Sequence, residues 1–151
     1  MRPEHKYLDI AIEEARRSLE KGEFPVGAVL VNGEGKIIAS GHNLVYTTLD
    51  PTAHAEIIAI RNAALRLKNH QLNGLRMYVT LEPCIMCAGA IVISRIEEVV
   101  YVVREPKFGG VYSLYQIPTD IRLNHTVRVR QVDYRRQEII DMMKAYFEKL
   151  R

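Results

Sequence analysis

The sequence has few cysteines and no long apolar run, and each shortage excludes a class of protein. Its two cysteines, Cys84 and Cys87, lie too close together to build the disulfide framework of a small secreted domain. The longest apolar stretch, residues 84–93, is too short to span a bilayer. Residues 1–21 are rich in charge and lack the apolar core of a signal peptide. We therefore expect a cytoplasmic protein with no membrane partner.

The chain also lacks internal repeats, linkers and low-complexity tracts. With 151 residues, 48% of them hydrophobic, residues 1–151 are expected to form one domain with a real core. The net charge of +3 suits a polyanionic partner but is too small to establish one. The simplest interpretation of the basic residues in the C-terminal third is a solvated charged surface; they are Arg122, Arg128, Arg130, Arg135 and Arg136.

The first half of the chain shows helical spacing followed by strand patterns. Apolar residues at helical intervals predict an amphipathic helix over residues 7–19 that ends near Gly22. Residues 25–31 resemble a buried strand, and Asn32-Gly33 is a hairpin signal that leads into a returning strand at 36–41. Residues 42–51 are expected to form a loop.

The second half continues the alternation. Thr52 is expected to cap a helix that runs to about Leu67, with an apolar side formed by Ile57, Ile58, Ile60, Ala64 and Leu65. Strands are expected at 77–81, 98–103 and 126–132, and Pro83 is expected at the first position of a further helix. A closing helix contains Ile139, Met143, Tyr146, Phe147 and Leu150. This order predicts a three-layer α/β/α sandwich around a mixed sheet.

Two short motifs together predict a catalytic zinc site. His54-Ala55-Glu56 and Pro83-Cys84-Ile85-Met86-Cys87 supply one imidazole and two thiolates. A structural zinc is normally closed by four protein ligands, whereas a catalytic zinc keeps one position for water. Zinc lowers the pKa of a bound water to about 7. Glu56 is left over as a non-ligand, and we expect it to carry protons for a hydrolytic reaction.

Two simpler interpretations compete with this one. Cys84 and Cys87 alone would also suit a thioredoxin-like redox pair, but redox chemistry gives no role to the upstream His-Ala-Glu motif. A closed structural zinc would need a fourth ligand, for which His42, His70 and His125 are the candidates. A purely structural site has no need of Glu56.

The motif pattern is that of zinc-dependent nucleobase deaminases. The chain resembles the bacterial tRNA-specific adenosine deaminases from about residue 23 to residue 150. The likeness is carried by Asp50-Pro51-Thr52-Ala53-His54-Ala55-Glu56, Thr80-Leu81-Glu82-Pro83-Cys84-Ile85-Met86-Cys87-Ala88-Gly89-Ala90, Ser94-Arg95-Ile96 and Leu123-Asn124-His125.

The resemblance implies a cytidine deaminase-like fold with a mixed five-stranded sheet. It also implies one Zn²⁺ per subunit held by His54, Cys84 and Cys87, a homodimer, and conversion of adenosine to inosine in the tRNA anticodon loop, at the first anticodon position. By the same resemblance, Asn43 hydrogen-bonds the base, Val26 forms an apolar wall and Lys107 lies near phosphate. His125 is either a substrate contact or a folding residue.

The chain departs from that family at three positions, which lie in or just before the loop of residues 104–110. Glu105 stands where relatives often carry Asp, and Val102 and Val103 stand where they often carry small residues. The zinc core itself does not specify the substrate. A deaminase of a free base or nucleoside, of the guanine or cytidine type, is therefore one alternative, and a non-catalytic RNA-binding subunit with a structural zinc is another.

Overall fold

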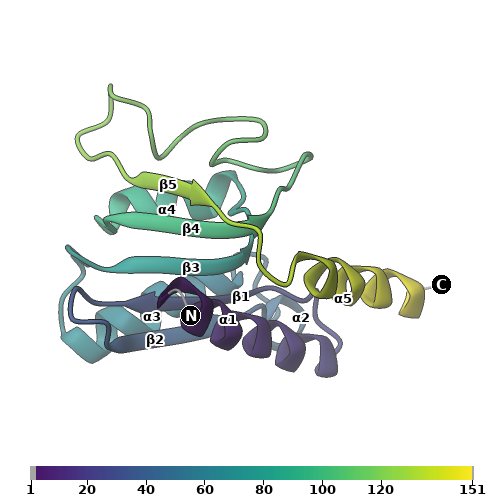
Figure 1. Cartoon of the computed structure of the whole chain (residues 1–151). Helices are drawn as coiled ribbons and strands as arrows, with labels where there is room; N and C mark the ends of the chain where they lie inside the picture. The colour runs from purple at the N-terminus through teal and green to yellow at the C-terminus, as the bar shows by residue number, and fades with distance from the viewer. Residues whose placement is uncertain (1–2, 151) are drawn as a thin grey trace.

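The computed structural model describes residues 3–150, in which five strands form one mixed sheet (Figure 1). In chain order the elements are α1 (Pro3–Glu20), β1 (Gly27–Val31), β2 (Ile37–His42), α2 (Val45–Thr48), α3 (Ala55–Leu67), β3 (Arg76–Leu81), α4 (Ile85–Ile93), β4 (Glu98–Val103), β5 (Arg128–Gln131) and α5 (Arg136–Lys149). The strand order is β2-β1-β3-β4-β5. The strands β2 and β3 run antiparallel to β1, whereas the pairs β3/β4 and β4/β5 are parallel.

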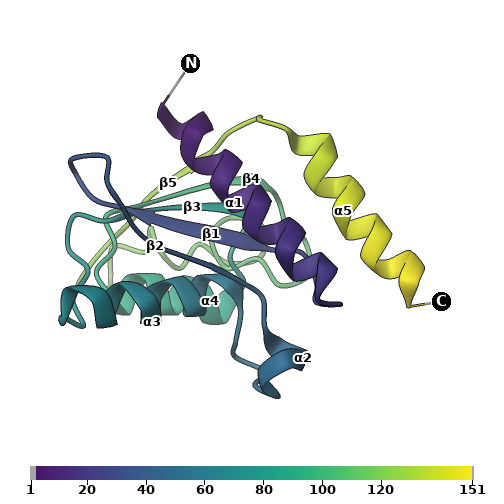
Figure 2. The same cartoon turned by 90° about the horizontal axis from the view of Figure 1, so that it is seen from below.

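The helices form two layers, one on each face of the sheet. Seen from below, α1 and α5 lie on one face and α3 and α4 on the other (Figure 2). Every residue of β1 and β4 is buried, as expected for strands covered on both faces. The predicted α/β/α sandwich with a mixed five-stranded sheet is therefore confirmed. No helix within residues 3–150 has the length and apolar character needed to cross a membrane.

The predicted hairpin is present, but its turn is longer than a two-residue turn. The side-chain oxygen of Asn32 accepts hydrogen bonds from the backbone N–H groups of Glu34 (3.0 Å) and Lys36 (2.9 Å). Gly35, not Gly33, adopts the left-handed conformation, with φ of +82°. The strand register shifts between Leu30 and Val31 to accommodate this loop.

The prediction for α3 was wrong in two respects. Thr52 does not cap the helix, because its hydroxyl donates to Asp50 Oδ1 (2.6 Å) and His54 occupies the N-cap position. The apolar side is only partly the one expected: Ile60 and Ala64 pack against the core, but Leu65 is 77% exposed, and the buried residues are Ala55, Glu56, Ala59 and Ala63. The helix lies so close to β2 that a Cβ placed on Gly41 would be 2.8 Å from the Ala55 carbonyl oxygen. Only small side chains fit that contact.

Three further expectations needed correction. Residues 42–51 are not a simple loop, because they contain α2. Pro83 lies one residue before the N-cap of α4, which is Cys84, and therefore not at the first helical position. In the closing helix the buried residues are Ile139, Met142 and Tyr146, whereas Phe147 and Leu150 are exposed.

Candidate active site

The three predicted metal ligands converge at the N-terminal ends of two helices. His54 is the N-cap residue of α3, Cys84 is the N-cap residue of α4, and Cys87 lies in the first turn of α4. The Nδ1 atom of His54 is 3.5 Å from Cys84 Sγ and 3.6 Å from Cys87 Sγ. The three donor atoms all lie within 4.8 Å of one another.

These separations fit a zinc ion. Tetrahedral zinc with ordinary Zn–N and Zn–S bond lengths places a nitrogen and a sulfur ligand about 3.6 Å apart. The two measured N–S distances agree with that value. One imidazole and two thiolates are also the donor types that zinc prefers. The cluster of His54, Cys84 and Cys87 is therefore consistent with a zinc cofactor.

Within residues 3–150, no fourth histidine, cysteine or carboxylate joins the cluster. The ring of His42 instead contacts Lys21 Nζ (2.9 Å) and lies 3.5 Å from a carboxylate oxygen of Glu14. The Nε2 atom of His125 bonds to the backbone oxygen of Ile96 (2.8 Å), which is a contact of the fold. A zinc ion held by these three residues would keep one coordination position for water, as in catalytic zinc sites.

The cluster favours the thiolate form of Cys84. A hydrogen bond from the Cys87 side chain and the neighbouring His54 lower the pKa of Cys84 to about 4, against the opposing effect of burial. The positive end of the α4 dipole adds to the same effect. A thiolate is the form that binds zinc.

Glu56 lies beside the cluster in the first turn of α3 and is only 4% exposed. Burial, together with the negative charge of Cys84, raises its pKa to about 7. A carboxyl with such a pKa releases and takes up protons near neutral pH. This is the property required of a proton carrier.

A cavity of about 400 Å³ opens beside these residues, a size typical of a small-ligand site. Its lining includes Val26, Asn43, His54, Glu56, Cys84 and Glu105. The Asn43 side chain is fixed, because its Nδ2 donates to the Phe24 carbonyl (3.2 Å) and its Oδ1 accepts from the Val45 N–H (3.1 Å).

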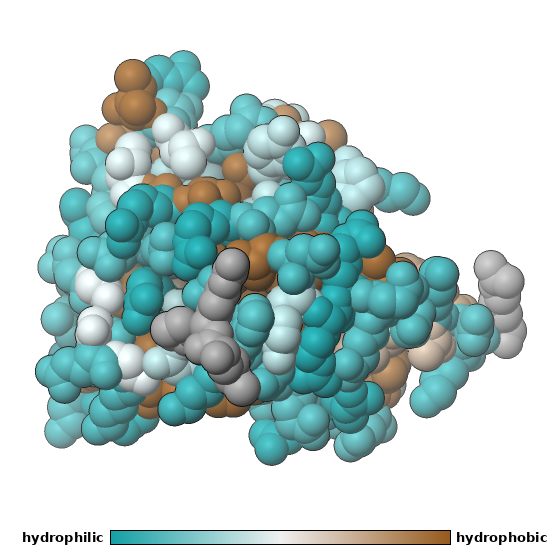
Figure 3. All heavy atoms as spheres, viewed as in Figure 1, coloured by the Kyte–Doolittle hydropathy of each residue, from teal (hydrophilic) through white to brown (hydrophobic). Residues whose placement is uncertain are grey.

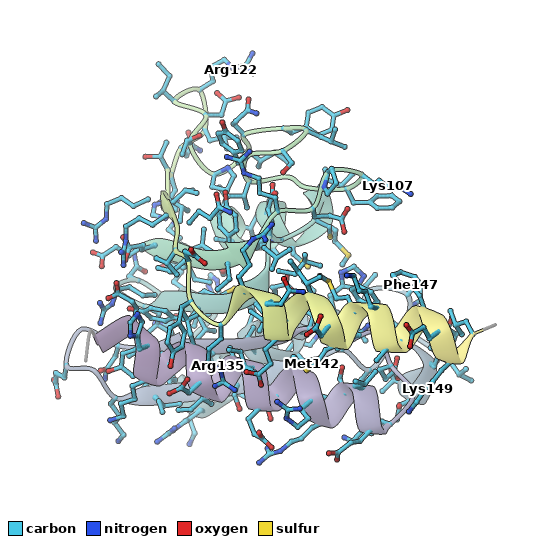
Figure 4. The ribbon with its side chains drawn as sticks, turned by 45° about the vertical axis from the view of Figure 1, so that its right-hand side comes forward. Lys107, Arg122, Arg135, Met142, Phe147 and Lys149 are labelled. Atoms are coloured by element: carbon cyan, nitrogen blue, oxygen red, sulfur yellow. The ribbon has the colours of Figure 1, made fainter. Side chains whose placement is uncertain are left out.

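Lys107 does not line this cavity. It lies on the loop that follows β4, where Figure 4 labels it, and its side chain is exposed. Its backbone N–H donates to the Glu105 carboxylate (2.9 Å). The structure therefore brings together six of the seven predicted site residues, and Lys107 stands apart on the outside of the loop.

Glu82 has an organising role that sequence analysis missed. It is 1% exposed, and its carboxylate accepts hydrogen bonds from the backbone N–H groups of Glu105 (3.0 Å), Tyr112 (2.8 Å) and Ser113 (2.8 Å). The Ser113 hydroxyl and the Val111 N–H also donate to it. One buried charge thus holds the loop that forms a wall of the cavity.

A sequence signal for Glu82 did exist. It follows directly after the buried strand β3 and precedes Pro83, so its side chain lies next to the interior. Burying an unpaired carboxylate is costly, which requires several donors around it. The cavity-lining rings Phe24 and Phe108 were missed for another reason, since isolated loop aromatics carry no periodic pattern.

Comparison with known proteins agrees with the site. Residues 1–103 match the family described as cytidine and deoxycytidylate deaminase zinc-binding region. The tRNA-specific adenosine deaminase of Aquifex aeolicus is 48% identical over 145 residues, covering 96% of this chain and 94% of that protein. The tRNA-specific adenosine deaminase of Bacillus subtilis is 44% identical and covers 100% and 92% of the two chains.

This chain belongs to the tRNA-specific adenosine deaminase family.

Solved structures of related proteins support the fold of this deaminase. A structure from a study of A-to-I editing by tRNA:A34 deaminases superposes with a TM-score of 0.85 and 38% identity, covering 91% of this chain and 98% of that one. The guanine deaminase of Bacillus subtilis has a TM-score of 0.63 and 34% identity, covering 95% and 92%. The zinc-binding architecture is thus common to enzymes that are named for different substrates.

Proposed function

We propose that this deaminase converts adenosine to inosine in tRNA by zinc-dependent hydrolysis, at the first anticodon position. The observation that carries the proposal is the buried Glu56 carboxyl beside a three-ligand zinc cluster at the wall of a base-sized cavity. The identity of 48% to a tRNA-specific adenosine deaminase supports tRNA as the substrate.

The reaction replaces the amino group at C6 of adenine with oxygen from water. Zinc supplies the activation of that water. Glu56 takes a proton from the water and delivers it to N1 of the base, while the new C–O bond forms at C6. Glu56 then takes the remaining proton from the new C6 hydroxyl and passes it to the amino group, which leaves as ammonia when the C–N bond breaks and the C6=O bond forms. The products, inosine and ammonia, account for every atom of adenosine and water.

The cavity residues have separate roles in holding the base. Val26, 8% exposed, offers an apolar wall. An amide carries two N–H donors, and Asn43 uses one of them for Phe24, so the second can donate to the base. The target nucleotide must leave its stack to enter, and an anticodon loop lowers that cost because its bases are already splayed. The exposed ammonium of Lys107 lies near phosphate.

The assembly is a homodimer with one zinc per subunit, each chain forming one domain. The support is α4, which is apolar on nearly all sides, yet the chain alone leaves Ile85 and Ile93 exposed. A partner subunit that covers α4 would adjoin the active site, because Ile85 also lines the cavity. The cytoplasm is the expected location, since thiolate ligands need a reducing compartment.

The test of the substrate is to incubate the zinc-loaded protein with tRNA and, separately, with guanine, cytidine and adenosine. We expect inosine at the first anticodon position, located by sequencing total tRNA after the reaction. Deamination of a free base without inosine in tRNA would instead favour a guanine or cytidine deaminase, the rival that the similarity to a guanine deaminase suggests.

The test of the mechanism is Glu56→Gln. We expect a loss of kcat of about 10²- to 10⁴-fold, the usual contribution of a positioned acid–base group, with one zinc still bound per chain by atomic absorption. Glu105→Gln is the matched control, because it removes a carboxylate from the same cavity without touching the zinc cluster. Normal inosine yield from the Glu56 variant would exclude it as the proton carrier.

A further inference from the structure

A second cavity, of about 670 Å³, lies on the other side of the loop that walls the active site. It is lined by Arg104, Pro106, Tyr112, Ser113, Gln131 and Arg136. These residues come from the segment after β4, the strand β5 and the first turn of α5. The carboxyl ends of β4 and β5 meet here, which is the edge of an open α/β sheet where ligands bind.

The Arg104 guanidinium is held in place rather than free to move. Its Nε donates to Gln131 Oε1 (3.3 Å), and its Cζ lies 4.3 Å from the centre of the Tyr112 ring. These two contacts leave the terminal N–H groups of Arg104 available. A planar guanidinium with two free N–H donors matches the geometry of a phosphate.

The arginines that line this cavity differ from the other arginines of the C-terminal third in their acidic neighbours. Arg122, Arg128, Arg130 and Arg135 each lie within 4 Å of a carboxylate. Within residues 3–150, Arg104 and Arg136 form no ion pair, and the second cavity has two guanidinium groups and no carboxylate in its lining. An anion is the ligand that would balance them.

The second cavity and the active site are lined by neighbouring residues of the same loop. Arg104 and Pro106 flank Glu105, which lines the catalytic cavity. Tyr112 and Ser113, which line the second cavity, donate to the same buried Glu82 carboxylate as Glu105 does. The two cavities are therefore neighbours, separated by the loop residues 104–106.

We infer that Arg104 and Arg136 bind a backbone phosphate of the RNA strand next to the target adenosine. The inference rests on the proposed function and adds to it a phosphate site separate from the cavity that holds the base. The two arginines contact the backbone and not a base edge, so they contribute affinity and register, whatever the neighbouring sequence.

The test uses an RNA stem-loop with adenosine at the first anticodon position. In Arg104→Gln/Arg136→Gln we expect KM to rise roughly tenfold with kcat at saturating RNA unchanged, because the chemistry is untouched. In the inactive Glu56→Gln background, the slope of log Kd against log salt should fall by about 0.7 for each lost phosphate contact. Each single variant should show part of both effects.

Arg122→Gln is the matched control for each single variant, because it removes one positive charge from an exposed residue at the tip of the loop, far from α5 (Figure 4). We expect its Kd and salt slope to stay at the parent values. Wild-type Kd and slope in the double variant, or an equal loss in the control, would overturn the phosphate site. Absence of inosine from the wild-type enzyme would instead overturn the proposed function, and the binding measurement would still report on the arginines.

Discussion

Glu82 is the residue on which the shape of the active-site wall depends most. Glutamine keeps its size, but the amide NH₂ of Glu82→Gln would face backbone N–H donors that now bond to a carboxylate oxygen. We expect the free energy of unfolding to fall by about 3 kcal/mol, the scale of hydrogen bonds to a buried charge. Urea unfolding at pH 7 measures this, and Glu148→Gln, on the exposed side of α5, should change it little.

The stability of the wild type and that of Glu82→Gln should also depend differently on pH. Burial opposes the ionisation of Glu82, but the hydrogen bonds from Ser113, Glu105 and Tyr112 outweigh it and hold its pKa below the ordinary 4.5. A lowered folded-state pKa stabilises the protein fully above about pH 4.5, and this stability is lost as pH falls through the folded value.

The stability difference between wild type and Glu82→Gln should therefore be constant from pH 7 to about pH 5 and shrink at lower pH. Urea unfolding at a series of pH values gives both curves, and other carboxylates cancel in the difference. A gap that stays the same down to pH 3 would contradict the view that the carboxylate is the stabilising form.

At the residue scale, the sequence predicted the candidate metal ligands better than the residues that surround them. The grouping of His54, Cys84 and Cys87 could be predicted because each motif is local and its residue types have a shared chemical reason. The donors to Glu82 come from residues 105–113, more than twenty positions away. No local pattern records such a contact, which depends on the path of the loop after β4.

Two helices share the zinc site, and this is the main feature at the scale of elements. The N-cap residues of α3 and α4 are the ligands His54 and Cys84, and neither makes a side-chain capping hydrogen bond. Zinc would thus join the beginnings of both helices. Removing it should destabilise the protein by about 4 kcal/mol if zinc is present at a thousand times its Kd.

The measurement is the Tm by calorimetry in excess chelator and again after zinc is restored. Hydrogen exchange should rise first in the opening turns of α3 and α4, while α1, on the opposite face of the sheet (Figure 2), stays protected. An unchanged Tm on complete zinc removal would mean that the two helix ends are held without the metal.

The limits of prediction at this scale are clearest in α3. Its existence and its end near Leu67 followed from apolar spacing, but only part of the side that faces the core did. Large residues such as Leu65 satisfied the pattern, whereas the close approach of α3 to Gly41 selected alanines. Apolar periodicity shows that a helix is amphipathic. It does not show how near the helix lies to its sheet.

At the scale of the whole molecule, the two outer faces differ in character. The face that carries α1 and α5 is mostly hydrophilic, with apolar atoms in a central strip, at the upper left and at the right-hand side (Figure 3). On the other face, Ile93 of α4 is 81% exposed and Ile85 is 46% exposed. We therefore place the subunit contact of the proposed homodimer at α4.

Ile93→Asp should convert the dimer to a monomer, because it puts a charge into an apolar contact. Sedimentation would show the lower mass, and the rate of inosine formation should fall, since Ile85 lines the catalytic cavity from the same helix. Leu65→Asp is the matched control, as Leu65 is 77% exposed on α3, and it should remain an active dimer. A fully active Ile93→Asp monomer would show that each active site is complete within one chain.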